Sequence, residues 1–541
     1  MKRYIILLTT LLATLGAVSQ NTNDTINRMV LVESTYNPII AGAVKRNFIP
    51  EEIEPSMKKE TIVYADESVP VQDFERMPRM VQSATMPRQP HHPGYVHLGL
   101  GNNLNFDGLA SYGLHYKERH HLTIGAHADG WHGKFKTDGE ERWQSSLYDL
   151  GLDVDYKLLL GNATLTAGLE GSRYRYNYLL QPSLYSGATD IQQGGRLGGQ
   201  FRLEGNAHEH YRYHVAAQYT RLGRSAYFTN EQRHSEQHFH AELSFGVDFY
   251  EYGLASLLVR SDLLMYRGLD NYRTYSSFGF TPRWDYSYGD LDITAGVNLD
   301  FQNLQGSAIQ VSPACEVRYT PSKLFAANLT IDGGRQLHSF GALYALSPYW
   351  ASQGQLANSY TFMNARLTGN LRIIEGLHFQ VGGGYRIMGN ALFENALDTL
   401  GTIYTGFSTH KAQVAYAHAQ ASYTYKDLYT IAAEGNYNHW MVGDNRSILT
   451  RAPQLDTRVN ARVRIIPGLY AHTDCRFILF TAIEGQRERA IIDWSLGAHY
   501  ALNERLSFFL DGHNLLNRHY HRYAGYPSQG INVMAGAAFK F

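Results

Sequence analysis

The sequence predicts an all-β protein: a transmembrane antiparallel β-barrel of about 22 strands, preceded by an extended or disordered N-terminal segment. Three observations predict this class. Apolar and polar residues alternate with a period of two in many segments after residue 94, short polar turns recur about every 43 residues, and the last segment ends on an aromatic residue. The composition agrees, because only 18% of the 541 residues are charged, while the chain holds 39 tyrosines and 50 glycines.

The composition also excludes other classes of protein. After the N-terminus, no apolar run approaches the ~18 residues that a membrane-spanning helix needs. The formal net charge is −1, so we expect no nucleic-acid partner. Two cysteines cannot build a disulfide framework or a cysteine-based metal centre. A soluble propeller would show repeated blade motifs, and the sequence has none.

Residues 1–19 predict a signal peptide, because the basic pair Lys2-Arg3 precedes a short apolar run and a small-residue cleavage site. We expect cleavage after Ser19 and export of the protein. Residues 20–93 carry eight of the 16 prolines and mixed charge. Such a segment buries too little apolar surface to offset its ordering entropy. It is therefore predicted to be a Pro-rich, largely extended periplasmic segment.

Residues 94–541 are predicted to form the barrel in the outer membrane. From Tyr148 to Leu158, apolar residues occupy every even position and polar or glycine residues occupy the odd ones. The segments 291–301 and 455–465 alternate in the same way. Each is about eleven residues long, which suits a tilted strand that crosses a bilayer. A helix would instead group its apolar residues three and four positions apart.

The short turns give the number of strands. Ten turns join ten pairs of strands, and one further strand lies at each end, which predicts 22 strands. Longer loops, such as 333–357 and 388–410, fall between these turns on the opposite rim. The sheet must close, because an open edge in lipid would leave backbone groups unpaired. The predicted turns lie near Lys117–Arg119, Gly161–Asn162, Gly205–Asn206, Glu251–Tyr252, Gly289–Asp290, Pro321–Lys323, Glu375–Gly376, Lys426–Asp427, Pro467–Gly468 and Asn503–Glu504.

The C-terminal segment alternates up to the last residue, so Phe539 and Phe541 belong to the predicted lipid-facing row. This ending resembles the terminal signal that the outer-membrane barrel-assembly machinery reads. The resemblance implies that machinery as a partner, beside the lipid of the outer membrane. It also implies a Gram-negative source.

The segments Asn514–Tyr520 and Gly525–Pro527, followed by a strand that ends at Phe541, resemble the C-terminus of TonB-dependent receptors. That family commonly carries an N-L-F-N-x-x-Y segment, a G-Y-P turn and a terminal Phe. Its barrels have 22 strands, which agrees with the number of strands predicted from the turns. The resemblance implies a transport function at the outer membrane.

A second segment, Val32–Ile40 followed by Ala43–Asn47 and Pro50, resembles the N-terminal region of TonB-dependent-receptor-like barrels of Bacteroidota. Members of the receptor family carry a folded plug of well over a hundred residues before the barrel. Here only residues 20–93 precede the barrel, so we expect that the plug is lacking. Tyr36 and Pro38 in this segment are candidates for contact with a partner or for occlusion of the barrel.

A 22-stranded barrel left empty would be a wide aqueous hole, so something must fill its lumen. The alternatives are inward-folded loops, the N-terminal segment, or another protein such as a periplasmic or surface lipoprotein. The loop around Leu343, Tyr344, Tyr349 and Trp350 is apolar, whereas an extracellular loop is normally polar. Either it folds into the lumen as a constriction, or it is a docking patch, or it belongs to an aromatic belt at the membrane interface.

His238, His240 and Glu242 share one face of a predicted strand whose other face is apolar, so they are expected to point into the lumen. Two histidines at i and i+2 with a carboxylate can ligate a metal such as zinc. The alternative is a solvated polar wall, which the sequence favours because the chain has 24 histidines. No cofactor is expected, and no local signature marks a catalytic nucleophile, so we expect no enzymatic activity.

The predicted function is that of a TonB-dependent-receptor-like barrel, which acts as a transport channel or as the barrel subunit of a transport or envelope complex. Two alternatives remain open at this point. One is a non-conducting platform for partner proteins, and the other is a passive porin. The sequence does not identify a substrate.

Overall fold

The computed structural model describes residues 93–541, apart from residues 117–118, 137–141, 181–190, 209, 227–228, 250–251, 305–306, 352–353, 400–401, 427 and 444. The predicted signal peptide, the predicted periplasmic segment up to residue 92, and the candidates Tyr36 and Pro38 lie outside the described residues.

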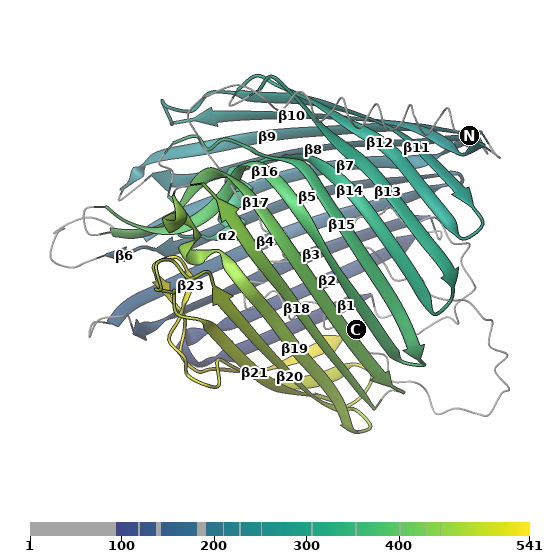
Figure 1. Ribbon diagram of the computed structural model, residues 1–541. Coiled ribbons are helices and arrows are strands. Elements are labelled where there is room, and N and C mark those ends of the chain that lie inside the picture. Colours follow the sequence, from purple (N-terminus) through teal and green to yellow (C-terminus); the bar gives the residue numbers. More distant parts are fainter. Residues whose placement is uncertain are drawn as a thin grey trace.

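A closed antiparallel barrel of 22 strands accounts for most of the described chain (Figure 1). Each barrel strand pairs with the next one along the chain, and β25 pairs with both β22 and β1, which closes the sheet. The barrel strands are β1 (Gly94–Gly101), β2 (Phe106–Tyr116), β3 (His120–Lys136), β4 (Arg142–Leu160), β5 (Ala163–Asn177), β7 (Ile191–His208), β8 (Tyr211–Ala226), β9 (Thr229–Asp248), β10 (Leu254–Arg267), β11 (Tyr275–Tyr288), β12 (Leu291–Gln302), β13 (Ile309–Ser322), β14 (Phe325–Gln336), β15 (Ser359–Ile374), β16 (Leu377–Thr399), β17 (Thr402–Tyr425), β18 (Tyr429–Val442), β19 (Pro453–Ile466), β20 (Leu469–Phe480), β21 (Ile491–Ala501), β22 (Leu506–His513) and β25 (Asn532–Lys540).

Several short elements lie outside the barrel wall. They are the strand β6 (Leu179–Leu180), the hairpin strands β23 (His521–Tyr523) and β24 (Tyr526–Pro527), the helix α2 (Phe340–Leu346), and the 3-10 helices η2 (Asn102–Leu104) and η4 (Arg446–Arg451). Among the described residues, no helix is long and apolar enough to cross a membrane.

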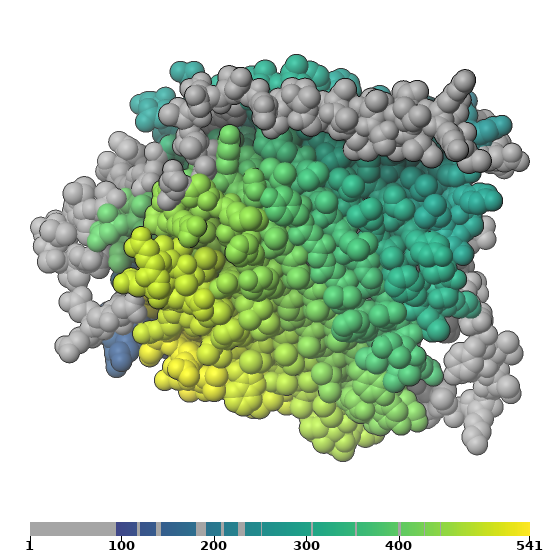
Figure 2. Space-filling view, viewed as in Figure 1, coloured from purple at the N-terminus to yellow at the C-terminus, as the bar shows by residue number. Residues whose placement is uncertain are grey.

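The alternation of residues separates two faces of the wall, as the sequence predicts. In β4, Leu150, Leu152 and Val154 are exposed on the outer face. In β12, Phe301 is exposed whereas its neighbour Asp300 is buried. Successive side chains of a strand point to opposite faces of its sheet, so the apolar rows face outward and the polar rows face the lumen. Figure 2 shows one side of the wall, where side chains of successive strands pack side by side.

The two rims of the barrel differ, as predicted for a membrane barrel. At the turn end, short connections join strands, as between β11 and β12 at residues 289–290 and between β19 and β20 at residues 467–468. The barrel also begins and ends at this rim, since Gly94 and Phe541 exchange two backbone hydrogen bonds of 2.9 and 3.0 Å. The opposite rim, here named the loop end, carries the long connections, including β6, α2 and the β23–β24 hairpin.

One predicted loop and one predicted turn are wrong. Residues 388–410, expected to be a long loop, belong almost entirely to the paired strands β16 and β17. Gly205 and Asn206 lie within β7, which continues to His208, and the connection to β8 comes at residues 209–210. A Cβ atom at Gly205 would lie 2.5 Å from the carbonyl oxygen of Asn162, in the turn directly before the neighbouring strand β5. Glycine is therefore required there by the close approach of two backbones and not by a turn.

Candidate functional site

An inward-folded connection between β14 and β15 lies across the loop end of the lumen; its described residues, 337–351 and 354–358, are named the lid here. The lid contains α2, whose first turn is capped by Ser339, because its Oγ accepts a hydrogen bond of 3.2 Å from the Ala342 amide. The sequence candidates Leu343, Tyr349 and Trp350 are at most 2% exposed. These residues therefore face the interior of the barrel and present no exposed docking patch.

One side of the lid packs into an apolar cluster formed by the loop ends of several strands. The lid contributes the buried residues Phe340, Leu343 and Trp350 to this cluster, and Tyr344 packs against the edge of the cluster. The barrel contributes the buried residues Leu222, Met388, Ala391, Leu392, Phe393, Ala412, Val414 and Trp440, and the segment around η4 adds Leu449 and Ala452. Burial of side chains of this size stabilises the docked lid by roughly 1.5–3 kcal/mol for each large side chain.

The other side of the lid packs into a cluster of aromatic rings. Tyr349 stacks on Tyr526 of β24 with ring centroids 3.8 Å apart, and Trp143 of β4 contacts both rings edge-on. Tyr176 of β5 also meets Tyr349 at 5.7 Å. Burial raises the pKa of Tyr349 and of Tyr526 well above the ordinary value, so both hydroxyls stay neutral.

The lid also makes polar contacts with the barrel wall. Trp350 forms a parallel bridge with Thr405 of β17, and the amide of Thr405 donates to the carbonyl of Tyr349 over 3.1 Å. At the start of α2, the Phe340 amide donates to Oε1 of Glu236 on β9 over 2.8 Å. These bonds satisfy backbone groups that would otherwise be buried without a partner.

Arg224 of β8 binds the lid to the barrel wall through hydrogen bonds and a cation–π contact. Its Nη2 donates to the Trp350 carbonyl over 2.8 Å and to the Tyr178 hydroxyl over 3.0 Å, and it also contacts the Tyr176 hydroxyl. The guanidinium carbon lies 4.4 Å from the centroid of the Trp350 ring, which is a cation–π geometry. Arg224 is only 4% exposed, so its contacts are made in a medium where they are stronger than in water.

Two further segments cover the loop end beside the lid. After β5 the chain crosses to β6, where Leu179 and Leu180 pair with Ile403 and Thr402 of the β17 strand. The β23–β24 hairpin joins the same region, since the Tyr526 hydroxyl donates to the Ile403 carbonyl. The described residues therefore close the loop end of the lumen with three segments that come from different parts of the chain.

The motif at Asn514–Tyr520 and Gly525–Pro527 has a structural role in this cover. The Asn514 side chain donates to the carbonyls of Arg518 and Gln529 over 2.9 and 2.7 Å, which holds the two arms of the connection together. Gly525 has a φ of +79°, and a Cβ atom there would lie 2.4 Å from Ile403. Glycine is required at this turn by both its backbone conformation and the space available.

Below the lid, the wall of the lumen is polar and ion-paired. Arg458 contacts Asp474 over 2.7 Å, and Arg476 contacts Asp456 over 2.7 Å, across the pair β19–β20. A cavity of about 110 Å³ lies under the β23–β24 hairpin and is lined by acidic and aromatic side chains, including Asp107, Asp129 and Tyr520. The lumen below the lid is therefore able to hold water and polar solutes.

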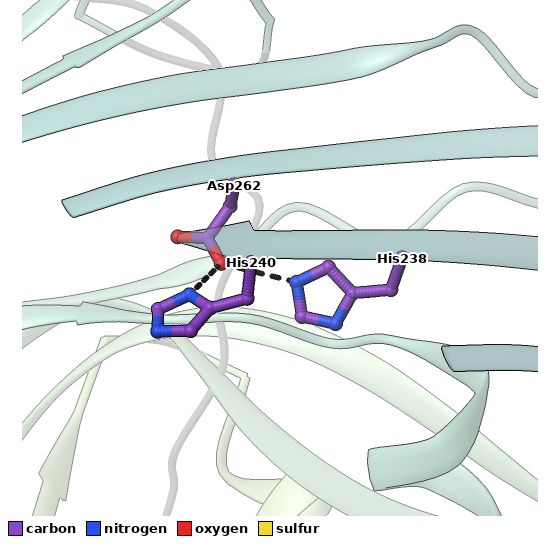
Figure 3. Close-up of side chains that lie close together, drawn as sticks. All are labelled: His238, His240 and Asp262. Carbon is purple, nitrogen blue, oxygen red and sulfur yellow. Dashed lines mark hydrogen bonds and ion pairs between the residues drawn. The ribbon is translucent and has the colours of Figure 1, made fainter. Parts of the chain in front are cut away.

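His238 and His240 of β9 face the lumen, and the structure places Asp262 of β10 between their rings (Figure 3). Oδ1 of Asp262 lies 3.0 Å from Nε2 of His238 and 2.8 Å from Nδ1 of His240. Glu242, the carboxylate expected from the sequence, lies instead 4.0 Å from the other nitrogen of His240. Asp262 could not be recognised from sequence alone, because its place depends on the register between β9 and β10.

The terminal residues Phe539 and Phe541 lie on the outer face at the turn end and are 43% and 46% exposed. Their rings stack on each other, with centroids 5.9 Å apart. The ring of Phe541 also fills the space where Gly94 would carry a Cβ atom. Both rings therefore lie at the seam where β25 meets β1.

Protonation of His338, at the start of the lid, is expected to make the stability of lid docking depend on pH. Its Nε2 accepts a hydrogen bond of 3.0 Å from the Ser359 amide, and burial lowers the pKa of its ring to about 3. An exposed histidine has a pKa near 6.5, so the undocked lid binds this proton more readily between pH 6.5 and 3. The contribution of His338 to docking is therefore fully present above pH 6.5 and is lost as the pH falls. At pH 4.5 the loss is roughly 2–3 kcal/mol.

Between pH 7.5 and pH 4.5, we expect lid opening, measured as channel-opening events in a planar bilayer, to rise about 100-fold more in the wild type than in a variant whose residue 338 cannot gain a proton. The variant His338→Asn keeps an acceptor for the Ser359 amide but cannot gain a proton. Its opening frequency should change much less over the same range. Equal pH responses of the two proteins would show that His338 does not control the lid.

No protein-family model matches this chain, and no curated protein matches it in sequence. Solved structures with the same fold do match. A mutant of the ferric enterobactin receptor PfeA from Pseudomonas aeruginosa has a TM-score of 0.61 at 11% identity, covering 84% of this chain and 81% of that one. The FrpB iron transporter from Neisseria meningitidis has a TM-score of 0.65 at 11% identity, covering 83% and 81%. The copper transporter OprC has a TM-score of 0.62 at 10% identity, covering 83% and 82%.

Proposed function

We propose that this chain is an outer-membrane barrel of the TonB-dependent-receptor-like type, which works as a gated transport channel or as the barrel subunit of a transport or envelope complex. The observation that carries the proposal is the buried lid in the lumen of a 22-stranded barrel. A barrel of this size encloses a wide passage, and a lid held by side chains of the wall can close it. The fold likeness to receptors and transporters supports the same function.

The outer face supports the membrane location. Its apolar rows are exposed along β4 and β19, where they can contact lipid. Exposed aromatic residues gather near the turn end, as in the girdles of membrane barrels. These are Tyr252, Tyr288, Tyr319, Phe325, Tyr425, Tyr500, Phe508 and Phe541. We assign the turn end to the periplasm and the loop end to the cell surface, with Phe539 and Phe541 as the barrel-assembly signal.

The lid distinguishes the proposal from a passive porin, whose lumen stays open. We assign Leu343, Tyr344, Tyr349 and Trp350 an occluding role at the cell-surface side. We propose that residues 20–93, with Tyr36 and Pro38, serve the periplasmic side, either by partial occlusion or by docking a periplasmic partner. A lipoprotein is one class of partner that fits this arrangement, and no plug domain is needed. The proposed function requires no enzymatic step, and the Bacteroidota origin follows only from the N-terminal resemblance.

A non-conducting platform for partner proteins is the second candidate function, because the same closed loop end would suit it. These two candidate functions can be distinguished with protein purified from native outer membranes, in one preparation with its co-purifying partners and in another without them. In a planar bilayer we expect the isolated protein to be nearly silent and to conduct when the partners are present. Steady conductance of the isolated protein would contradict the proposal in favour of a porin. Silence in both preparations would favour the platform.

A further inference from the structure

We propose that His238, His240 and Asp262 form a binding site for a divalent transition-metal ion of the zinc or copper class in the wall of the lumen. The ligating atoms of the three side chains lie within 4.8 Å of one another. Two imidazoles and one carboxylate are a donor set that suits these borderline metals better than Mg²⁺ or Ca²⁺, which prefer oxygen ligands. The inference is independent of whether the barrel conducts.

The pairing of β9 with β10 places the three donors. Asp262 is directly opposite His240 in the antiparallel register, and His238, two residues earlier on β9, is its diagonal neighbour. Side chains at such positions on one face of a sheet lie within contact distance. Since both strands belong to the closed wall, the donor atoms are held by rigid backbone and not by a mobile loop.

The distances suit a shared metal ion. The two nitrogens approach one carboxylate oxygen to 3.0 and 2.8 Å, as Figure 3 shows. Ligand atoms around a tetrahedral zinc, with bonds of about 2.0–2.2 Å, are roughly 3.3 Å apart. Each nitrogen would therefore have to move away from the carboxylate oxygen by only a few tenths of an ångström, and rotation of the imidazole rings would bring the two nitrogens, which lie within 4.8 Å of each other, to a ligand-to-ligand distance. The side chains of His238 and His240 are 23% and 29% exposed, so further positions on the ion would be open to water in the lumen.

The surroundings of the three side chains resemble the outer shell of a metal site. Oδ2 of Asp262 lies 3.5 Å from Nη2 of Arg335, which leaves Oδ1 directed at the two imidazoles. The charge of Arg335 is balanced further by Asp300, whose Oδ1 is 3.7 Å from the same Nη2. Glu242 lies 4.0 Å from the distal nitrogen of His240, too far for a hydrogen bond but near enough to add negative charge beside the three donors.

The site lies just below the lid. Glu236, two positions before His238 on β9, accepts the hydrogen bond from the first residue of α2. Arg335, which contacts Asp262, is the penultimate residue of β14, and the lid begins directly after that strand. An ion bound here would thus lie on the wall at the entrance that the lid covers.

The test is a titration of the purified full-length protein in detergent with Zn²⁺, buffered by a competing chelator. We expect one site that is lost on substitution: His238→Ala and His240→Ala should each weaken binding at least 100-fold, and Asp262→Asn at least tenfold. The matched control is His127→Ala, because His127 also faces the lumen beside one carboxylate, Asp149, at 3.9 Å. We expect His127→Ala to change the affinity for Zn²⁺ by less than twofold.

A second measurement does not depend on affinity. With one equivalent of Cu²⁺, the electron paramagnetic resonance spectrum of the wild-type protein should show two nitrogen ligands, and that of His238→Ala should show one. Heat-modifiable migration on gels would confirm that each variant retains a folded barrel. Equal Zn²⁺ binding by the wild type and the double variant His238→Ala/His240→Ala would overturn the proposal, as would a Cu²⁺ spectrum without a nitrogen pair.

Discussion

Replacing residues 340–350 with a Gly-Ser linker of equal length is expected to raise the single-channel conductance of the protein at least tenfold. The replaced segment contains α2 and supplies Phe340, Leu343, Tyr349 and Trp350 to the two buried clusters. It also carries the bridge from Trp350 to Thr405. Without these contacts the lid loses most of its apolar packing in the lumen, and the passage through a 22-stranded barrel is wide.

The matched control for this replacement is a linker of equal length in place of residues 303–308, which join β12 and β13 at the same rim. Asn303 of that connection bonds locally to Thr274 and Ser276. We expect its conductance to equal that of the wild type. If the lid replacement also left the conductance unchanged, the lid would not be the barrier in the lumen.

The substitution Arg224→Met is expected to destabilise lid docking by about 3 kcal/mol, which raises the population of the undocked lid roughly 100-fold. Methionine approximates the length of the side chain but donates no hydrogen bond. The Trp350 carbonyl and the Tyr178 hydroxyl, which accept from Nη2 at 2.8 and 3.0 Å, would then be buried without that donor. Hydrogen exchange of the amides of residues 340–350 measures the effect directly.

Two further arginine variants serve as comparisons for Arg224→Met. Arg224→Lys retains the charge but not the planar fork, so we expect a smaller loss of protection than in Arg224→Met. Arg212→Met removes an arginine from the turn end of the same strand, where its contact with Asp248 at 3.0 Å is largely exposed. That variant should change the protection of the lid by no more than about 0.5 kcal/mol. Equal exchange in Arg224→Met and Arg212→Met would exclude Arg224 as the residue that fastens the lid.

The barrel could be predicted from the sequence because its signals are local. The period-two pattern of Tyr148–Leu158 reports which face of a strand meets lipid, and the polar turns report where strands reverse. Closure then follows from the membrane. The one wrong turn, at Gly205, shows the limit of such signals. A glycine that allows close approach to the backbone of Asn162 looks the same in sequence as a glycine in a turn.

The closure of the lumen could be predicted only as a set of alternatives. The apolar character of Leu343–Trp350 is visible in the sequence, and the structure places these residues inside the barrel. The residues that these side chains contact cannot be recognised from the sequence, because Arg224, Thr405 and Tyr526 are more than fifty residues away in the chain. An isolated arginine near the end of a strand carries no pattern that would mark it as the anchor of a distant loop.

The same limit applies to the histidine site. His238 and His240 could be found because they share one face of a single strand. Their carboxylate could not, because a shift of one residue in the register of β9 and β10 would turn Asp262 to the other face. The sequence offers Glu242, a carboxylate of the same parity two positions from His240, which the structure places 4.0 Å from the outer nitrogen of His240.

The proposed function requires a closed wall with lipid outside and water inside, and spin labels placed one at a time along β4 test this arrangement most directly. Cys315 and Cys475, which are free thiols, would first be replaced by alanine. Labels at residues 150, 152 and 154 should then collide mainly with oxygen dissolved in the bilayer. Labels at residues 149, 153 and 155 should collide mainly with a water-soluble nickel chelate. Uniform accessibility along the strand, with no alternation between the two sets, would contradict the barrel and every proposal that depends on it.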